Sequence, residues 1–277
     1  MLKRVLTAAA GIPVVVFVIK SSGEEIFFVF VLLVVVLALK EFFSMALSDE
    51  DVWGKRLGIA LGCLVLLSSF LGSRSSAGNN SDPFFLSAGC LVFSFFALFF
   101  YHITFDHKIK DAFNRIAIKV FGIFYVALLF SYVILLRARS DGTSLLFYLL
   151  FMTWAGDTGA YIIGRWKGRN ALCSKISPGK TIEGALGSFV SGLLISFLCR
   201  MLFLEKISIL NCLALGVGIN LLNQFGDLCE SLLKRSFAVK DSGSVLPGHG
   251  GVLDRIDSLM FAAPFLFYYV KIVMPDT

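Results

Sequence analysis

Two pairs of acidic residues flank a polar segment near the end of the sequence. Asp227 and Glu230 stand three residues apart before it, and Asp254 and Asp257 stand three residues apart after it. Residues at i and i+3 share one face of a helix, and consecutive helices can be neighbours, so both pairs can meet at one site. Clustered carboxylates favour a hard cation such as Mg²⁺, which shares its ligand shell with substrate phosphates.

Basic residues lie in the same segment. Lys234, Arg235, Lys240 and Arg255 supply positive charge for phosphate groups. Acidic residues for a metal ion beside basic residues for phosphate form the arrangement that phosphoryl or nucleotidyl transfer requires. From spacing alone, the alternative is a set of salt bridges that closes the segment.

Glycines surround the histidine of this segment. Gly243, Gly248, Gly250 and Gly251 permit tight turns and a close approach of the backbone to a ligand. His249 can donate to a phosphate or bind a metal, although the default role of a lone loop histidine is structural. The sequence leaves both interpretations open.

An isolated acidic residue, Asp157, stands inside an otherwise apolar run earlier in the chain. If that run spans a membrane, the carboxylate costs about 2.5–3.5 kcal/mol, which makes it a candidate functional residue. The glycines beside it can instead mark close helix packing, with Asp157 satisfied by a neighbouring helix.

A third candidate site lies at residues 177–184. It resembles a phosphate-binding P-loop around Lys180, but Ser174 stands where that motif needs a glycine. Ser177 followed by Pro178 predicts a helix start, with Glu183 near the first turn. A helix N-terminus beside Lys180 would form an anion site, and ordinary capping is the alternative.

The elements that must position these residues are membrane-spanning helices. The 277-residue chain is 57% hydrophobic and 16% charged, with a mean hydropathy of +0.83, whereas soluble domains carry about 25% charged residues. A spanning helix needs about 20 apolar residues. Candidate spans lie near 5–19, 26–43, 57–73, 84–104, 116–136, 144–163, 184–203, 207–225 and 258–273.

We therefore predict an all-α, polytopic membrane protein with about nine transmembrane helices. Residues 1–277 form a single membrane domain in this prediction, with N-terminal spans in 1–136 and a catalytic C-terminal part in 144–277. The first two spans are short and can instead form a hairpin that enters one leaflet.

The basic residues predict the orientation of these spans. With the N-terminus inside, 18 of the 25 Lys and Arg residues fall on the inner side, as the positive-inside rule requires. The loops 164–183 and 226–257 then face the cytoplasm. The net charge of +6 is partly this bias, and the remainder suits anionic lipids and nucleotide phosphates.

The segment 231–257 matches a known signature at every fixed position. It resembles the phosphatidate cytidylyltransferase family, whose members are polytopic membrane proteins with this signature near the C-terminus. The C-terminal half carries the resemblance, and the N-terminal half matches only as apolar spans. The matching positions are Ser231, Lys234, Arg235, Lys240, Asp241, Gly243, Pro247, His249, Gly250, Gly251, Asp254, Arg255 and Asp257.

The resemblance implies an enzyme that transfers CMP from CTP to phosphatidic acid, giving CDP-diacylglycerol and pyrophosphate. We expect Asp227, Asp254 and Asp257 to hold Mg²⁺, with a second cation possible, and to act as catalytic residues with Lys234 and Arg235. The predicted substrate-binding residues are Asp157, Ser177, Lys180, Lys240, His249, Gly250, Gly251 and Arg255.

The resemblance and the topology also predict partners and location. The expected partners are CTP, phosphatidic acid and membrane lipids, with no nucleic acid and a homodimer possible. The expected location is the inner (plasma) membrane, with the active site facing the cytoplasm.

Three other functions compete with this interpretation. A related membrane enzyme, a lipid-phosphate cytidylyltransferase acting on another lipid or a polyprenol kinase, would share the same core. A CDP-alcohol phosphotransferase requires an acidic motif that is absent, because Asp141 and Gly142 are followed by Thr143 and Ser144. A secondary transporter would explain Asp157 but predicts a matching mid-membrane acid in the first half, where we find none.

Overall fold

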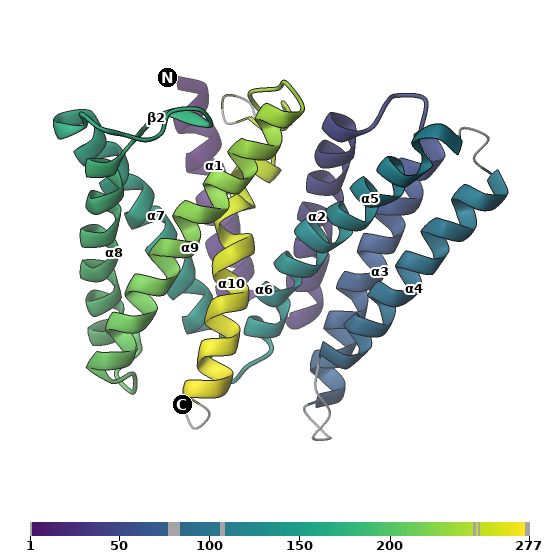
Figure 1. The fold of residues 1–277 in the computed structure, drawn as a ribbon. Helices are drawn as coiled ribbons and strands as arrows, with labels where there is room; N and C mark the ends of the chain where they lie inside the picture. Colours follow the sequence, from purple (N-terminus) through teal and green to yellow (C-terminus); the bar gives the residue numbers. More distant parts are fainter. Residues whose placement is uncertain (1, 77–83, 106–108, 246–247, 249, 275–277) are drawn as a thin grey trace. The chain divides into compact units, whose positions relative to one another are not determined.

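The computed structural model describes residues 2–76, 84–105, 109–245, 248 and 250–274, and it is almost entirely helical (Figure 1). Its elements in chain order are α1 (Leu2–Ser21), α2 (Glu24–Ala46), α3 (Val52–Ser76), α4 (Phe84–Phe105), the 3₁₀ turn η1 (Ile109–Asp111), α5 (Ala112–Gly122), the π-helical turn η2 (Ile123–Leu128), α6 (Leu129–Arg137), α7 (Gly142–Lys167), β1 (Ala171–Cys173), β2 (Ser177–Thr181), α8 (Ile182–Phe203), α9 (Ile209–Ser236) and α10 (Leu253–Val273).

Within the described residues, eight helices are long and apolar enough to cross a membrane. The prediction of an all-helical, polytopic membrane protein is confirmed. The first predicted span, 5–19, falls within the 20-residue helix α1, of which Gly11–Ser21 counts as a further, shorter apolar helix. The second predicted span is not short, because α2 extends over 23 residues, enough to cross a bilayer of about 30 Å.

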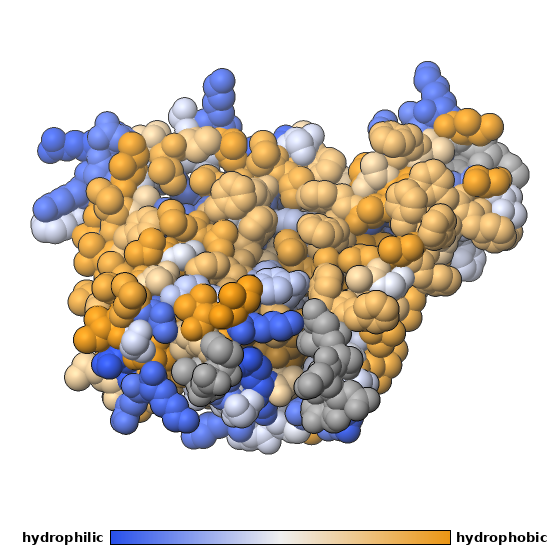
Figure 2. Space-filling model, turned by 60° about the horizontal axis from the view of Figure 1, so that its bottom comes forward, coloured by the Kyte–Doolittle hydropathy of each residue, from blue (hydrophilic) through white to orange (hydrophobic). Residues whose placement is uncertain are grey.

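Hydrophobic side chains cover much of the surface in Figure 2, and hydrophilic ones gather towards its margins. A soluble protein rarely exposes apolar surface on this scale, whereas lipid-facing helices require it. The outer face of α8 shows the pattern at four-residue spacing. Its exposed residues are Ile182, Leu186, Val190, Leu194, Leu198 and Leu202.

Contacts divide the chain into two compact units. The first contains Met1–Ala138 and Asp241–Arg255, and the second contains Arg139–Lys240 and Ile256–Thr277. The segment 241–255, which we grouped with the C-terminal part, thus packs with the N-terminal helices. The single membrane domain stays a prediction.

The first unit is built around α2 and α3, which pack against the π-helical turn and α6. Gly122 at the end of α5 lies close to two aromatic rings of α2, since a Cβ there would lie 2.6 Å from the Phe43 ring and 2.8 Å from the Phe42 ring. A buried ion pair joins Lys119 of α5 to Asp51 at 2.6 Å.

The second unit is built on close packing of α7 and α8. A Cβ at Gly159 of α7 would lie 2.6 Å from the carbonyl oxygen of Gly187, and a Cβ at Gly187 of α8 would lie 2.7 Å from the carbonyl oxygen of Gly159. Small residues at such positions let helix backbones approach one another. Against α9, α10 packs through an edge-to-face contact of Phe225 with Phe261.

A short hairpin connects α7 to α8. Strands β1 and β2 are antiparallel, with Cys173 opposite Ser177. Our prediction of a helix start at Ser177 and Pro178 is therefore wrong. The residue before proline favours extended backbone, and α8 begins at Ile182, where the Thr181 hydroxyl accepts from the Gly184 N–H at 3.1 Å.

Candidate active site

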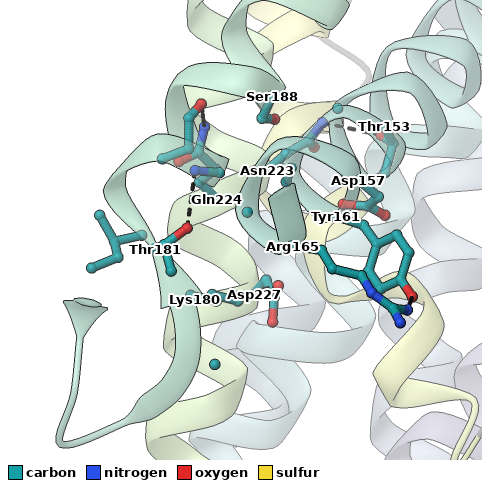
Figure 3. Close-up of a pocket in the computed structure, with 17 residues that line it drawn as sticks. Thr153, Asp157, Tyr161, Arg165, Lys180, Thr181, Ser188, Asn223, Gln224 and Asp227 are labelled. Atoms are coloured by element: carbon teal, nitrogen blue, oxygen red, sulfur yellow. Dashed lines mark hydrogen bonds and ion pairs between the residues drawn. The ribbon is translucent and has the colours of Figure 1, made fainter. Parts of the chain in front are cut away.

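A cavity of about 410 Å³ lies in the second unit, among α7, α8, α9 and the hairpin. Figure 3 shows polar side chains from all these elements converging on it. The lining residues are Thr153, Gly156, Asp157, Ala160, Tyr161, Gly164 and Arg165 of α7, Leu172, Gly179, Lys180 and Thr181 of the hairpin, Gly184, Ala185 and Ser188 of α8, and Asn223, Gln224 and Asp227 of α9.

Cationic side chains reach this cavity from two elements. Lys180, at the end of the hairpin, forms an ion pair with Asp227 of α9. From α7, the Arg165 guanidinium donates to the Tyr161 hydroxyl at 2.7 Å. Two predicted binding residues, Lys180 and Asp157, therefore line the same cavity, and Arg165 adds a second cation suited to phosphate.

The hairpin that carries Lys180 is tied to α8 at both of its ends. Glu183, in the first turn of α8 as predicted, accepts from the backbone N–H of Arg169 at 3.1 Å and from the Asn170 side-chain amide at 2.8 Å. These bonds fasten the start of the hairpin to α8. Thr181, the residue directly after Lys180, caps α8, so the backbone on one side of the lysine is tied to that helix.

An amide group defines another part of the cavity wall. The Thr153 hydroxyl donates to the Leu149 carbonyl oxygen at 3.0 Å, so it can only accept from Asn223, whose Nδ2 lies 3.2 Å away. This fixes the orientation of the Asn223 amide. Its buried Oδ1 has no hydrogen-bond partner among the described residues and is open to a hydrogen-bond donor.

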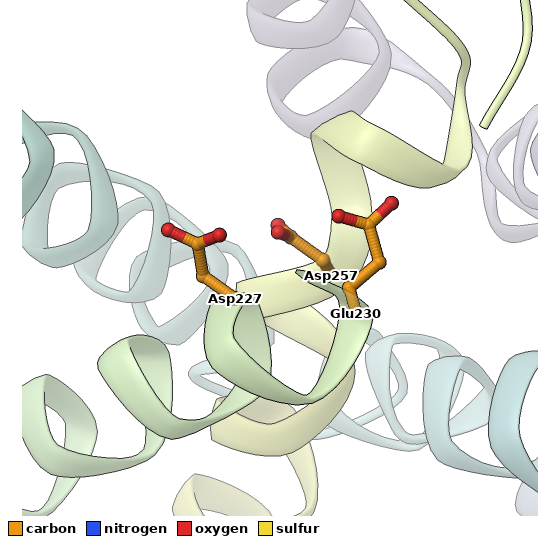
Figure 4. A group of neighbouring side chains, drawn as sticks. All are labelled: Asp227, Glu230 and Asp257. Atoms are coloured by element: carbon orange, nitrogen blue, oxygen red, sulfur yellow. The ribbon is translucent and has the colours of Figure 1, made fainter. Parts of the chain in front are cut away.

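Three carboxylates gather beside the cavity. The carboxyl groups of Asp227 and Glu230 of α9 and Asp257 of α10 lie side by side in Figure 4, and one oxygen of each lies within 4.8 Å of the others. Lys234 donates to Glu230 at 2.6 Å. Asp257 is 8% exposed, and it experiences like charge from Asp227 and Asp157 and opposite charge from Lys234. Such a group favours binding of a cation.

Asp254, the third predicted metal ligand, belongs to the first unit. Its carboxylate accepts from the backbone N–H of Gly251 at 2.8 Å and of Ser242 at 3.1 Å. Gly250 has a φ of +78° and a Cβ there would meet this carboxylate, so the turn needs glycine. The metal role of Asp254 stays a prediction, and Asp254 and Asp257 stand one turn apart on α10.

The remaining predicted residues are spread over the chain. Arg235 is exposed and donates to the carbonyl oxygens of Val239 at 3.1 Å and Ile176 at 3.4 Å. Ser177 lies in β2 and not in the lining of the cavity. Lys240 and Arg255 are exposed. His249 and Pro247 lie outside the described residues.

The structure also places residues at the site that the sequence analysis did not select. Asn223 and Gln224 lie in the same span as Asp227, and spacings of three, four and three residues put Asn220, Asn223, Asp227 and Glu230 on one face of α9. Polar residues inside a membrane span are candidate functional residues. The two asparagines of this face could therefore have been selected from the sequence. Thr153, Tyr161 and Arg165 had no such signal, because each is an ordinary residue near the end or middle of an apolar run.

The whole sequence matches one known family. A model of the cytidylyltransferase family matches residues 2–273. The chain belongs to this family. The match includes the N-terminal spans, which resembled the family only as apolar segments, and the prediction made from the C-terminal signature is confirmed.

Individual members of this family are similar to the chain over nearly its full length. The phosphatidate cytidylyltransferase of Synechocystis sp. is 32% identical over 99% of this chain and 97% of its own. The phosphatidate cytidylyltransferases of Staphylococcus saprophyticus and Staphylococcus aureus are 35% and 34% identical, each over 95% of this chain and 97% of their own.

Proposed function

We propose that this protein is a phosphatidate cytidylyltransferase, which transfers CMP from CTP to phosphatidic acid and releases pyrophosphate. The observation that carries the proposal is the group of Asp227, Glu230 and Asp257 beside a cavity that contains Lys180 and Arg165. Nucleotidyl transfer needs both parts, anionic ligands for a cation and cationic groups for phosphates. The names of the full-length relatives supply the substrates.

In the proposed reaction, a phosphate oxygen of phosphatidic acid attacks the α-phosphorus of CTP. A new P–O bond forms, the bond between the α-phosphorus and the bridging oxygen to the β-phosphorus breaks, and the electron pair leaves with pyrophosphate. The attacking oxygen is already anionic, so no strong base is required. Lys180 and Arg165 bind and orient phosphates, and catalysis consists mainly of positioning and charge stabilisation.

The donor set fits a hard divalent cation. Three carboxylate groups within 4.8 Å offer only oxygen ligands, which suits Mg²⁺. When bound, Mg²⁺ neutralises the charge that develops on the phosphate oxygens. Asp227, Glu230 and Asp257 would hold it. A contribution from Asp254 and a second cation stay predictions from the sequence.

The same proposal gives the site a side of the membrane. The hairpin with Lys180 and the C-terminal end of α9 with Lys234 and Arg235 lie in the loops that the positive-inside rule assigns to the cytoplasm. CTP would then reach the site from the cytoplasm, at the inner surface of the plasma membrane. The acyl chains of phosphatidic acid would stay between the helices.

Release of pyrophosphate by the purified protein in detergent tests the proposal. The assay supplies phosphatidic acid and Mg²⁺ with each of the four nucleoside triphosphates in turn, for the unaltered protein, Asp227→Asn and Glu205→Gln. Glu205 is an exposed acid between α8 and α9 and serves as the matched control. We expect release with CTP alone, dependent on the lipid, retained in Glu205→Gln and reduced at least about 100-fold in Asp227→Asn.

Two results would contradict the proposal. Folded protein that releases no pyrophosphate with any nucleotide is not a cytidylyltransferase for phosphatidic acid, and the same assay with other lipid phosphates would then identify its acceptor. Full activity in Asp227→Asn would remove the carboxylate group from the mechanism.

A further inference from the structure

A buried glutamate in the N-terminal half contacts the signature segment. Glu41 lies on α2, near its C-terminal end, and is only 5% exposed. It belongs to the first unit, as does the segment 241–255. A carboxylate in such surroundings is stable only when hydrogen-bond donors surround it.

The donors come from the signature segment. Oε1 of Glu41 accepts from the backbone N–H of Val252 at 3.0 Å, and Oε2 accepts from that of Leu253 at 2.9 Å. The Ser242 hydroxyl donates to Oε2 at 3.3 Å. These two backbone N–H groups stand at the start of α10, where a helix has no internal partners for them and where its dipole favours negative charge.

Two glycines allow this approach. A Cβ at Gly243 would lie 2.6 Å from Oε1 of Glu41, and a Cβ at Gly251 would also meet this carboxylate. Side chains at either position would push the segment away from α2. Gly243 and Gly251 are therefore required for packing against Glu41, in addition to the close approach to a ligand that glycines permit.

Asp254 binds the same segment through other backbone groups. Asp254 accepts from the backbone N–H groups of Ser242 and Gly251, while Glu41 binds the Ser242 hydroxyl and the next two backbone N–H groups after Gly251. The two carboxylates therefore share one hydrogen-bonded turn, and the position of Asp254 depends on the position of that turn.

We propose that Glu41 is a positioning residue for the transfer reaction, which fixes the turn at 241–255 and with it Asp254 and Arg255. The inference rests on the proposed function for the reaction, but its structural part stands on these contacts alone. Glutamine cannot replace Glu41, because its amide nitrogen would face an N–H or O–H donor in either orientation. Aspartate keeps the charge and is shorter by one methylene group.

The test compares Glu41→Gln, Glu41→Asp and the control Glu25→Gln, which alters an exposed acid on the same helix that pairs with Arg74. Two quantities are measured on each purified protein: kcat for CMP transfer per folded molecule, and hydrogen exchange of the amides at residues 250–255. We expect Glu41→Gln to lower kcat about 10-fold or more and to speed exchange at Val252 and Leu253 by a similar factor. Glu41→Asp should be intermediate, and Glu25→Gln unchanged.

A residue with only a general structural role would lower thermal stability and the folded fraction, but kcat per folded molecule and local exchange would stay as in the unaltered protein. That result overturns the inference. If Glu41→Gln does not fold, Glu41→Asp decides, and unchanged kcat and exchange in that variant overturn it equally. Failure of the proposed function would appear as inactivity of the unaltered protein, while hydrogen exchange would still test the contact.

Discussion

Lys180 and Asp227 form an ion pair in the cavity, and in the proposed reaction each binds a different partner. A phosphate group of CTP is a stronger and more flexible anionic partner for Lys180 than a single carboxylate, because it offers several charged oxygens. When Lys180 binds phosphate, Asp227 becomes available to a cation. The ion pair therefore keeps both side chains ordered before the substrates bind.

Lys180→Gln removes the cationic group and leaves a side chain of similar length. We expect kcat/KM for CTP to fall about 10- to 100-fold, the loss that corresponds to one charge-assisted hydrogen bond. The matched control is Lys175→Gln in the turn of the same hairpin, where the side chain is exposed and does not line the cavity. Equal effects of the two substitutions would show that the loop needs only positive charge, without a specific contact at Lys180.

The sequence predicts the charged residues of the site better than its neutral ones. Spacing of three residues singled out Asp227 with Glu230, and an acid in an apolar run singled out Asp157. Asn223 lies on the polar face that the spacing in α9 predicts, but its hydrogen bond to Thr153, 70 positions away in the chain, could not be read from the sequence. Glu41 was missed because nothing near it in sequence shows that its partners are more than 200 positions away.

Helix and strand limits depend on local bonds that apolar periodicity does not contain. The start of α8 illustrates this. The dipeptide Ser177–Pro178 predicts a helix start, but a hairpin follows α7, and the cap is Thr181, the residue directly before the helix. Pro178 is tolerated in a strand at the edge of a two-stranded sheet. The prediction had the correct type of capping residue, placed four positions too early.

A buried group of charged and polar side chains connects helices of the first unit. Lys119 of α5 is fully buried, pairs with Asp51 just before α3, and lies 3.0 Å from the His102 ring of α4. This group joins α5 to α4 and to the residue that precedes α3. Once such a cluster is buried, removal of one partner leaves the other charge without compensation in a medium of low polarity.

Lys119→Met should destabilise the protein by about 3–5 kcal/mol, because Asp51 would keep its charge without a cation. Thermal unfolding in detergent, followed by circular dichroism, measures the change as a lower midpoint temperature. Lys55→Met is the control, since Lys55 pairs at 3.4 Å with Asp49, a fully exposed side chain, and exposed pairs contribute little. A midpoint that is unchanged in Lys119→Met would contradict the stabilising role of the pair.

The whole molecule combines an apolar surface with an uneven distribution of basic residues. The eight long helices of the described residues need lipid around them, and 18 of the 25 Lys and Arg residues lie in segments predicted to face inwards. A single helix is enough to test this orientation. Helix α8 has 22 residues and is therefore about 33 Å long, enough to cross the bilayer. The hairpin precedes this helix and Lys206 follows it, so the two should lie on opposite sides of the membrane.

Labelling with a membrane-impermeant maleimide in intact cells measures the orientation directly. Lys206→Cys should react from outside, and Lys175→Cys should react only after the membrane is permeabilised, with the unaltered protein as the background from its native cysteines. Both positions are exposed, so lack of access to solvent would not explain a failure. The reverse pattern would place the cavity on the outer side, where CTP is absent, and would contradict the proposed function.

The glycine contact of α7 with α8 limits how the cavity can change. Gly159 and Gly187 bring two backbones together, each glycine against the carbonyl oxygen of the other. An extra methyl group at either position would not fill the cavity. It would separate the helices that carry Asp157 and Ser188 and make the cavity wider. Substitution of either glycine would therefore alter the cavity through the spacing of its walls, whereas substitution of a lining residue would alter it through one side chain only.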